Sequence, residues 1–336
     1  MAGSRTGPRV IVITGAGAGV GRAAARRFAR EGARIGLIGR DAARLRQAQD
    51  DVHRLGGSAV AYPCDVVDAA RLDAAADAFE ASLGPIDVWV NNAMATVFSP
   101  VHSISPAEFR RATEVTYLGT VHGTMAALRR MRPRNRGTIV QVGSALAYRA
   151  IPLQAPYCGA KFAVRGFTDA LRCELLHERS RVHVTMVQMP ALDTPQFDWA
   201  RNHMSRRPQP VAPIFMPELA ADAIAWASRR RRREVYVGMP TLKAIWANKL
   251  VPGLLDRYLA RTCYAAQQSR EPEALDHHDN LFAPVPGGYA AHGRFDACAK
   301  QGRVGAWLSI HRGEVAAAVL GLAFAGVAGA RRLRSD

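Results

Sequence analysis

Short apolar runs alternate with longer amphipathic stretches over most of the chain. Continuous apolar runs bounded by Gly, Pro or polar residues are typical of parallel strands that are buried on both faces. Such runs predict strands at 9–13, 33–39, 58–62, 86–90, 137–143, 182–189 and 234–238.

The stretches between these runs carry the apolar spacing of helices. They predict helices at 22–31, 41–55, 68–83, 106–131, 156–178 and 217–229. Regular strand–helix alternation predicts an α/β fold with a Rossmann-type, doubly wound parallel sheet of about seven strands. We expect one catalytic domain over 8–240, followed by an irregular extension over 241–312.

A glycine-rich stretch, TGAGAGVG, follows the first predicted strand and precedes the first predicted helix. Glycines allow a tight turn and a close approach of the backbone to a pyrophosphate, and the helix N-terminus supplies free N–H groups. The stretch therefore predicts a dinucleotide site that includes Thr14, Gly15, Gly17, Gly19, Val20 and Gly21.

Further candidates lie at the carboxyl ends of the next strands, where open parallel sheets bind ligands. Arg40 follows the second strand where many NAD-binding folds carry a carboxylate, which favours the 2′-phosphate of NADP; alternatively, it only begins the next helix. Asp65 follows the third strand and can accept the adenine amino group. Asn91, Asn92 and Ala93 follow the fourth.

Three polar residues with catalytic chemistry lie near the fifth and sixth strands. Tyr157 and Lys161 are four residues apart and so share a helix face, and Ser144 ends a strand. Phenol has a pKa of about 10, and one cation at ~4 Å stabilises a phenolate by ~4 kcal/mol, which lowers that pKa by about three units. We therefore expect Lys161 to acidify Tyr157, and Ser144 to orient a substrate oxygen toward it.

The composition of the chain adds little to the predicted fold and site. The net charge of +17 would point to nucleic acid or an anionic surface, but only four of the 45 basic residues are lysines, so an arginine bias explains it. We find no nucleic-acid recognition motif. Five scattered cysteines without a C-x-x-C pair predict neither disulfides nor a zinc site. Without a signal peptide at the N-terminus, a cytoplasmic setting is expected.

From Val10 to Gly238 the chain resembles the short-chain dehydrogenase/reductases. The resemblance rests on TGAGAGVG, CDV, NNA, Ser144, YCGAK and PALDT, in the family's order and spacing. It implies an NAD(P)-dependent oxidoreductase in which Tyr157 is the general acid/base and Lys161 binds the nicotinamide ribose. It further implies cofactor contacts from Asp65, Val66, Asn91, Pro190, Leu192 and Thr194.

Two positions depart from the family pattern. Met94 stands where a glycine is usual, which narrows the space beside the nicotinamide. Thr116 stands where the family places the asparagine of its catalytic tetrad, so the proton relay to Lys161 is either weaker or partly replaced by a threonine hydroxyl.

The remaining segments are less specific. The loop 191–217, with Phe197, Trp199 and Phe215, is the expected substrate lid and favours a bulky apolar substrate. The pair His277–His278 lacks metal-ligand spacing, so we expect no metal.

Residues 315–330, within a predicted apolar helix at 313–332, contain no charge and precede RRLR. Three interpretations are open: a helix buried in an interface or against its own domain, an amphipathic anchor on a membrane surface, and a short membrane span.

The sequence as a whole predicts an NADP-preferring oxidoreductase. We expect it to interconvert a carbonyl and a secondary alcohol of a small-molecule substrate that is bulky and apolar, as a homo-oligomer that does not bind nucleic acid. The alternative is a non-catalytic cofactor-binding or membrane-attached interaction protein, for which Met94 and Thr116 would be early signs of lost activity.

Overall fold

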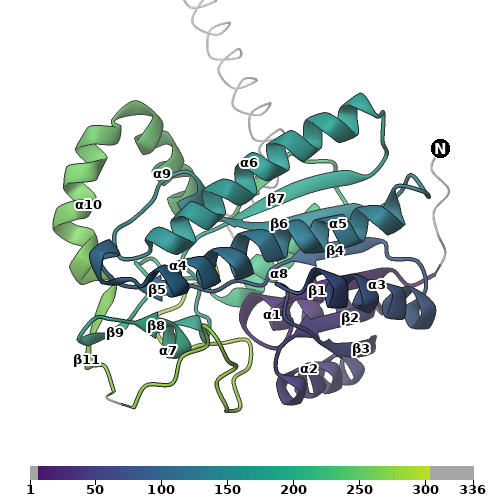
Figure 1. Cartoon of the computed structure of the whole chain (residues 1–336), viewed down its shortest axis with the longest axis horizontal. Coiled ribbons are helices and arrows are strands. Elements are labelled where there is room, and N and C mark those ends of the chain that lie inside the picture. The colour runs from purple at the N-terminus through teal and green to yellow at the C-terminus, as the bar shows by residue number, and fades with distance from the viewer. Residues whose placement is uncertain (1–6, 275, 303–336) are drawn as a thin grey trace, which may run out of the picture.

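A single parallel sheet forms the centre of the molecule. The computed structural model describes residues 7–274 and 276–302. Within them, seven strands pair in the order β10-β7-β6-β4-β1-β2-β3, with every pair parallel (Figure 1). The predicted Rossmann-type sheet is confirmed. Its strands are β1 (Val10–Thr14), β2 (Arg34–Gly39), β3 (Ser58–Pro63), β4 (Val88–Asn91), β6 (Thr138–Ser144), β7 (His183–Met189) and β10 (Glu234–Tyr236).

Helices cover both faces of this sheet. Successive side chains of a strand point to opposite faces. In β1, Ile11 and Ile13 therefore enter one buried core with helices α1, α2 and α8, while Val10 and Val12 enter the other with α3, α5 and α6. The helices are α1 (Gly19–Ala29), α2 (Ala42–Arg54), α3 (Ala69–Leu83), α4 (Pro106–Thr113), α5 (Gly119–Met131), α6 (Ala155–His177) and α8 (Pro217–Ala227).

The strand order reverses at β1, which lies between β2 and β4. In open α/β sheets, a ligand crevice forms at this switch point, beyond the carboxyl ends of the strands. The glycine-rich stretch leaves β1 at this edge, so the topology places it at the crevice.

The long helix predicted over 106–131 is interrupted. It begins with a capping box between Ser105 and Glu108, and a π-helical turn at Glu114–Leu118 separates α4 from α5. The first helix also starts earlier than predicted, at Gly19, within the glycine-rich stretch.

The extension after the sheet is more regular than predicted. Its first part forms two helices, α9 (Met239–Leu250) and α10 (Pro252–Ala266), which project from the body (Figure 1). Pro252 and Gly253 follow the end of α9 and form the start of the first turn of α10. In the sequence, such a Pro-Gly pair resembles a loop, which is why the sequence predicts an irregular segment here. Strand β11 (Gln268–Pro272) then pairs with β9 (Arg206–Pro208) of the predicted lid, which also contains α7 (Gln196–Trp199) and β8 (Arg201–Asn202) paired with β5 (Val97–Phe98).

The apolar helix predicted at 313–332 lies outside the described residues. Within the part of the chain that the structure describes, none of the helices combines the length and the apolar character needed to cross a membrane.

Candidate functional site

The glycine-rich loop lines a cavity of ≈ 200 Å³ at the switch point of the sheet. Gly15 has φ +67°, a conformation that favours glycine, and a Cβ there would lie 2.9 Å from Asn92 Nδ2. Helix α1 has no side-chain cap at its N-terminus. Gly17, Gly19 and Val20 at this helix end line the cavity, and a helix N-terminus favours an anion such as a pyrophosphate. The predicted cofactor residues in this cavity are Gly15, Gly17, Gly19, Val20, Arg40, Asp65, Val66, Asn92, Ala93 and Thr194.

The floor of this cavity is fixed by Thr14 and Asn92. The Thr14 hydroxyl accepts hydrogen bonds from the backbone N–H groups of Asn92 (3.0 Å) and Ala93 (3.1 Å), and Asn92 Nδ2 donates to Thr14 O (3.0 Å). Thr14 is buried by these contacts. It thus joins the ends of β1 and β4, and its side chain holds the cavity floor instead of lining it.

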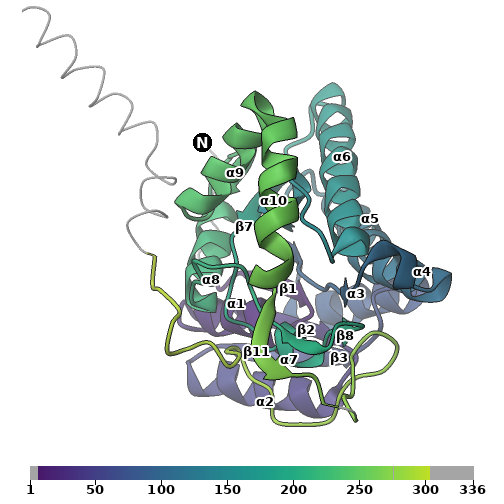
Figure 2. The ribbon, with the colours of Figure 1, turned by 90° about the vertical axis from the view of Figure 1, so that its left-hand side faces the viewer.

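A segment from the far end of the chain, residues 280–296, closes one side of the cavity; we call it the strap (Figure 2, yellow-green). Asn280 and Pro284 line the cavity directly. The Arg40 guanidinium donates to the carbonyls of Asn280 and Leu281, and the N–H of Gly19 donates to Ala290 O (2.9 Å). The strap therefore accepts hydrogen bonds from the Arg40 guanidinium and the Gly19 N–H, two groups that a dinucleotide would also contact.

Two further side chains hold the strap at this end. Arg44 donates to Val285 O (2.9 Å) and lies over the Trp199 ring, 4.9 Å from its centroid. Trp199 in turn packs edge-on against Tyr289, with 4.7 Å between the ring centroids. Sequence reasoning did not identify Arg44 or Asn280 as site residues, because nothing local in the sequence indicates that residues about 240 positions apart meet.

Ser144, Tyr157 and Lys161 line a second cavity of ≈ 300 Å³. Ser144 ends β6, and Tyr157 and Lys161 lie on the first turns of α6. Val20, Asn92, Met94, Thr194 and Gln196 line both this cavity and the glycine-loop cavity. The two cavities thus adjoin, as expected for one extended ligand. Pro190 and Leu192 also line the second cavity.

Burial controls the protonation of the two α6 residues. Burial raises the pKa of the Tyr157 phenol, and the hydrogen bond with Ser144 lowers it only in part. Burial also lowers the pKa of Lys161 to about 8. Lys161 Nζ donates to Val142 O at 2.7 Å and lies 5.5 Å from the Tyr157 ring centroid.

Burial thus opposes the expected acidification of Tyr157 by Lys161 in the protein alone. The Lys161 ammonium donates to a backbone carbonyl, and the burial that disfavours the phenolate also lowers the pKa of Lys161. A phenolate in this cavity needs further positive charge.

Four predicted site residues do not line either cavity. Asn91 is buried in a polar network in which Trp89 Nε1 donates to its Oδ1 (2.8 Å), and Asn91 Nδ2 donates to Gln141 Oε1 (2.9 Å). The Thr116 hydroxyl both donates to Ala95 O and accepts from Ala95 N, each at 2.9 Å. Thr14 and Gly21 are the other two.

Thr116 thus has its hydroxyl occupied, and its part in a proton relay stays a prediction. Gly21 acts through packing, since a Cβ there would lie 2.1 Å from Gly15 O.

The substrate end also contains residues that no sequence pattern indicated. Pro240, Thr241 and Ala244 of α9 and Leu259 and Cys263 of α10 line the second cavity. The extension is fixed there by buried amides, because Gln154 Nε2 donates to Gln267 Oε1 at 2.7 Å.

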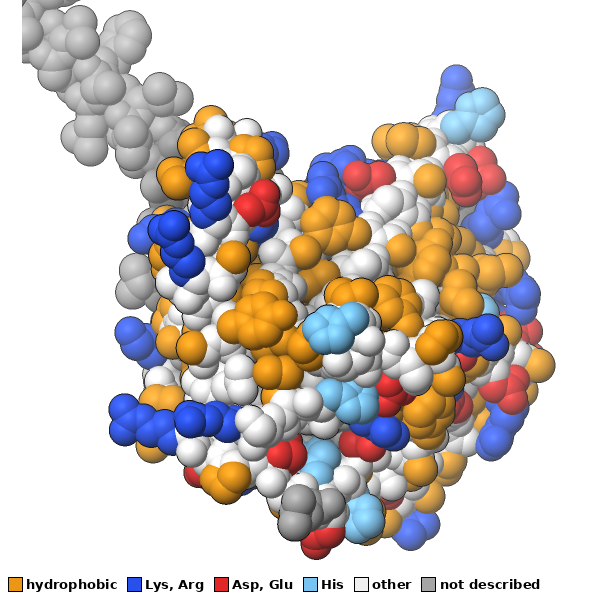
Figure 3. Space-filling view, turned by 60° about the vertical axis from the view of Figure 1, so that its left-hand side comes forward, with side chains coloured by type: hydrophobic (Ala, Val, Ile, Leu, Met, Phe, Trp, Pro, Cys, Tyr) orange, Lys and Arg blue, Asp and Glu red, His pale blue; other side chains and the backbone are white. Residues whose placement is uncertain are grey.

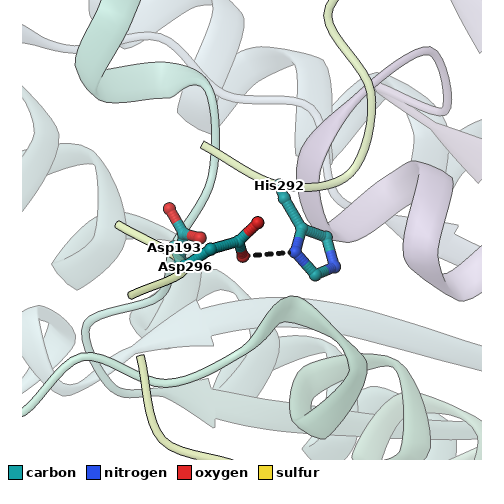
Figure 4. A group of neighbouring side chains, drawn as sticks. All are labelled: Asp193, His292 and Asp296. Carbon is teal, nitrogen blue, oxygen red and sulfur yellow. Dashed lines mark hydrogen bonds and ion pairs between the residues drawn. The ribbon is translucent and has the colours of Figure 1, made fainter. Parts of the chain in front are cut away.

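Asp193, His292 and Asp296 form the one group of potential metal ligands found among the described residues (Figure 4). His292 Nδ1 lies 2.5 Å from Asp296 Oδ1, and its Nε2 lies 2.8 Å from Glu218 Oε1. A protonated imidazole donates to both carboxylates, so the arrangement is satisfied by a proton. The cluster fastens the strap beside Thr194.

The hydrogen bonds that His292 makes with Asp296 and Glu218 should hold the strap less strongly as the pH rises. Burial lowers the pKa of His292, but its bonds to Glu218 and Asp296 outweigh this and raise it. A raised histidine pKa gives stabilisation that is present below the unfolded pKa of about 6.5 and is lost as the pH rises through the folded value. Burial raises the pKa of Asp193 to about 6, so above this pH a buried charge adds to the loss.

We therefore expect amide hydrogen exchange in the strap, corrected for intrinsic exchange, to accelerate between pH 6 and ~9. His292→Gln should exchange fast throughout and lose most of the pH dependence. A wild-type strap equally protected at both ends of this range would contradict the assignment.

The comparisons with known proteins agree with this geometry. The family described as short chain dehydrogenase matches residues 9–204. The uncharacterized oxidoreductase YxnA of Bacillus subtilis is 30% identical over 79% of this chain and 75% of its own length. A fatty acyl-CoA reductase of Acinetobacter baylyi is 27% identical over 70% of this chain and 78% of its own.

Two solved structures share the fold. A metagenomic short-chain oxidoreductase in complex with NADP has a TM-score of 0.58 and 27% identity, covering 68% of this chain and 96% of that one. An alcohol dehydrogenase from Thermococcus sibiricus, complexed with 5-hydroxy-NADP, has a TM-score of 0.60 and 25% identity with the same coverage. With its glycine-lined crevice and its Ser–Tyr–Lys group, the chain belongs to the short-chain dehydrogenase family and is an NAD(P)-dependent dehydrogenase/reductase.

Proposed function

We propose that the protein is an NADP-preferring oxidoreductase that interconverts a carbonyl and a secondary alcohol on a bulky, apolar substrate. One observation carries the proposal: Ser144, Tyr157 and Lys161 line a cavity that adjoins the glycine-loop cavity through five shared residues. A dinucleotide across both cavities would have its adenosine end near Arg40 and its nicotinamide end near Tyr157.

The protein's own groups supply binding and proton transfer. The bound dinucleotide supplies the hydride. Ser144 donates a hydrogen bond to the substrate oxygen, and Tyr157 gives that oxygen its proton in the direction of reduction. Lys161, which is 3% exposed, holds the ribose and returns a proton to the phenolate. Its pKa of about 8 suits proton exchange near neutral pH.

The substrate cavity is lined mainly by apolar groups. Apolar residues, among them Leu146, Ile151, Met189, Phe197, Val211 and Leu259, outnumber the polar residues in its lining. Pockets of this kind bind apolar ligands and orient them with a few polar groups. The likeness to a fatty acyl-CoA reductase supports a long-chain carbonyl compound as the substrate class.

A screen of long-chain aldehydes, steroids and ketoacyl compounds, followed by the absorbance of the reduced nicotinamide, tests the proposal. Turnover should rise with apolar size up to the limit of the cavity. A protein that binds NADPH but reduces no carbonyl compound of any size would sink the proposal and favour a non-catalytic cofactor-binding protein.

Arg40 carries the preference for NADP. Its guanidinium lies in the glycine-loop cavity, and burial lowers its pKa, so a 2′-phosphate would pair with a partly desolvated cation. Arg40→Ala should raise the KM for NADPH by about 10- to 100-fold, the effect of losing a charge-assisted hydrogen bond. The KM for NADH should change little.

The exposed Arg46 on α2 gives a matched control, because Arg46→Ala removes the same charge away from the cavity. Equal effects of the two substitutions would exclude direct contact between Arg40 and the phosphate. Equal losses for NADPH and NADH in Arg40→Ala would show that Arg40 supports the fold of the cavity through the strap and does not select NADP.

A homo-oligomer also stays a prediction. Large apolar side chains on α4 to α6, such as Met125 and Phe162, are exposed in the single chain, which supports packing of these helices against another subunit.

A further inference from the structure

The two helices of the extension form an amphipathic hairpin, residues 239–266, with two different functional faces. Its inner face lines the substrate cavity through Thr241, Ala244 and Leu259. Ile245 packs on Tyr148 in a small buried cluster beside the cavity. The hairpin is therefore one wall of the site to which the substrate must gain access.

The outer face of the hairpin is unusually apolar. In the described part of the chain, seven of the 14 large apolar side chains that are exposed lie on these 28 residues. The greatest exposure surrounds the turn between the helices, where Leu250 is 73% and Leu254 64% exposed. Apolar patches of this kind mark sites of contact with a partner or a membrane. Trp246, Val251 and Tyr258 extend the patch along both helices.

Basic side chains surround the patch. Lys243, Lys249, Arg257 and Arg261 are exposed on the hairpin, and its one acidic residue, Asp256, is paired with Arg149 at 2.5 Å. Lys249 Nζ lies 5.4 Å from the Trp246 ring centroid. Figure 3 shows orange and blue side chains interleaved on the projecting upper left of the molecule, which is the hairpin.

The positive charge of the hairpin indicates which kind of partner its outer face binds. Two copies of the hairpin would bring like charges together, which opposes self-association. An anionic lipid surface attracts the cations, while the apolar side chains at the turn enter the boundary between headgroups and acyl chains.

We propose that the α9–α10 hairpin docks on an anionic lipid surface, with the wall of the substrate cavity facing the bilayer. An apolar substrate would then pass between the bilayer and the cavity with little exposure to water. The docking is inferred only from the exposed apolar and basic side chains of the hairpin. The passage of substrate also rests on the proposed function.

Sedimentation of the full-length protein with vesicles tests the docking. We expect binding to vesicles of phosphatidylcholine with phosphatidylserine, weaker binding to phosphatidylcholine alone, and loss of binding as salt is raised. Leu250→Ser with Leu254→Ser should weaken binding at least ten-fold. Lys243→Gln with Lys249→Gln and Arg257→Gln should remove most of the dependence on phosphatidylserine.

A matched control is Leu176→Ser on α6, which removes a side chain of equal exposure (72%) far from the hairpin and should bind as the wild type does. Tryptophan fluorescence gives a second readout: vesicles should shift the wild-type emission to shorter wavelength, and Trp246→Phe should remove that shift. Neither Leu250 nor Leu254 lines the cavity, so reduction of a small water-soluble carbonyl compound should be unchanged in their variant.

Three results would overturn the docking. The first is that the full-length protein does not bind anionic vesicles at low salt. The second is that the Leu250/Leu254 variant binds as tightly as the wild type, which would place the contact elsewhere, for instance in 315–330. The third is a wild-type dimer that becomes monomeric in this variant while its vesicle binding is unchanged. Inactivity of every variant and of the wild type on soluble carbonyl compounds would instead count against the proposed function.

Discussion

Replacing Tyr157 with Phe should lower turnover by about 10²- to 10⁴-fold, the usual contribution of a positioned general acid. The substitution removes one oxygen and keeps the ring that lies 5.5 Å from Lys161 Nζ. Because the cavity is otherwise intact, the affinity for NADPH should change by less than about three-fold, a difference smaller than 1 kcal/mol. Stopped-flow measurement of hydride transfer and a fluorescence titration with NADPH measure the two quantities separately.

The control for this substitution is Tyr117→Phe. Tyr117 packs edge-on against Phe167, and it lines neither of the two site cavities. Wild-type turnover is expected there. Turnover that survived in Tyr157→Phe would remove Tyr157 as the acid, whereas a parallel loss of NADPH binding would show that its hydroxyl maintains the cavity.

Gly21→Ala should damage both the fold and cofactor binding. The new Cβ would lie 2.1 Å from Gly15 O and 2.7 Å from Asn92 Nδ2, and the first of these is backbone that cannot rotate away. Forcing atoms into such a contact costs about 1–3 kcal/mol or more. The glycine loop can relieve the clash only by moving off the cavity floor, so the affinity for NADPH should fall together with the free energy of unfolding. Urea denaturation and the same fluorescence titration measure both.

Gly166→Ala is the matched substitution for Gly21→Ala. Gly166 lies in the interior of helix α6, and a Cβ there would meet no atom within 4 Å. Alanine is the better helix former, so this variant should be up to ~1 kcal/mol more stable than the wild type. If the two variants had equal stability and equal NADPH affinity, the close packing of the loop against Gly21 would not be required.

The pair formed by Tyr157 and Lys161 raises a physical question about its protonation. Burial raises the pKa of Tyr157 and lowers that of Lys161 to about 8, so near neutral pH the phenol keeps its proton and the Lys161 ammonium is favoured less strongly than a free one. That is a suitable resting state for an acid that must hold its proton until a substrate oxygen arrives. The energy that makes the phenolate accessible then has to come from groups brought in with the ligands, which agrees with the position of Lys161 beside the expected ribose.

The strap gives the cofactor cavity a second set of contacts. Arg40 and Gly19 both donate hydrogen bonds to its carbonyls, so a bound dinucleotide would share or replace them. The His292 cluster holds the other end of the same segment. The affinity for the cofactor and the pH response of the strap should therefore be linked.

The sequence by itself determined the sheet and identified the candidate catalytic residues. Apolar runs such as 9–13 and 182–189 predict strands of a parallel sheet, because the helices on both faces of such a sheet bury every side chain of the strand. The glycines at 15 and 19 predict the cradle, since their role depends on the local backbone. Spacings within one helix, such as that of Tyr157 and Lys161, are equally local.

Only the tertiary structure decided which distant segments complete the site. Asn91 and Asn92 are neighbours in sequence, but β4 directs the first into the core and the second toward the cavity. Arg40 contacts Asn280, and Leu259 lines the same cavity as Tyr157, because loops and helices fold back over the sheet. Contacts across 100 to 240 residues depend on packing and chain direction, which leave no periodic signal in the sequence. Local chemistry is therefore readable from the chain, whereas the walls of its cavities are not.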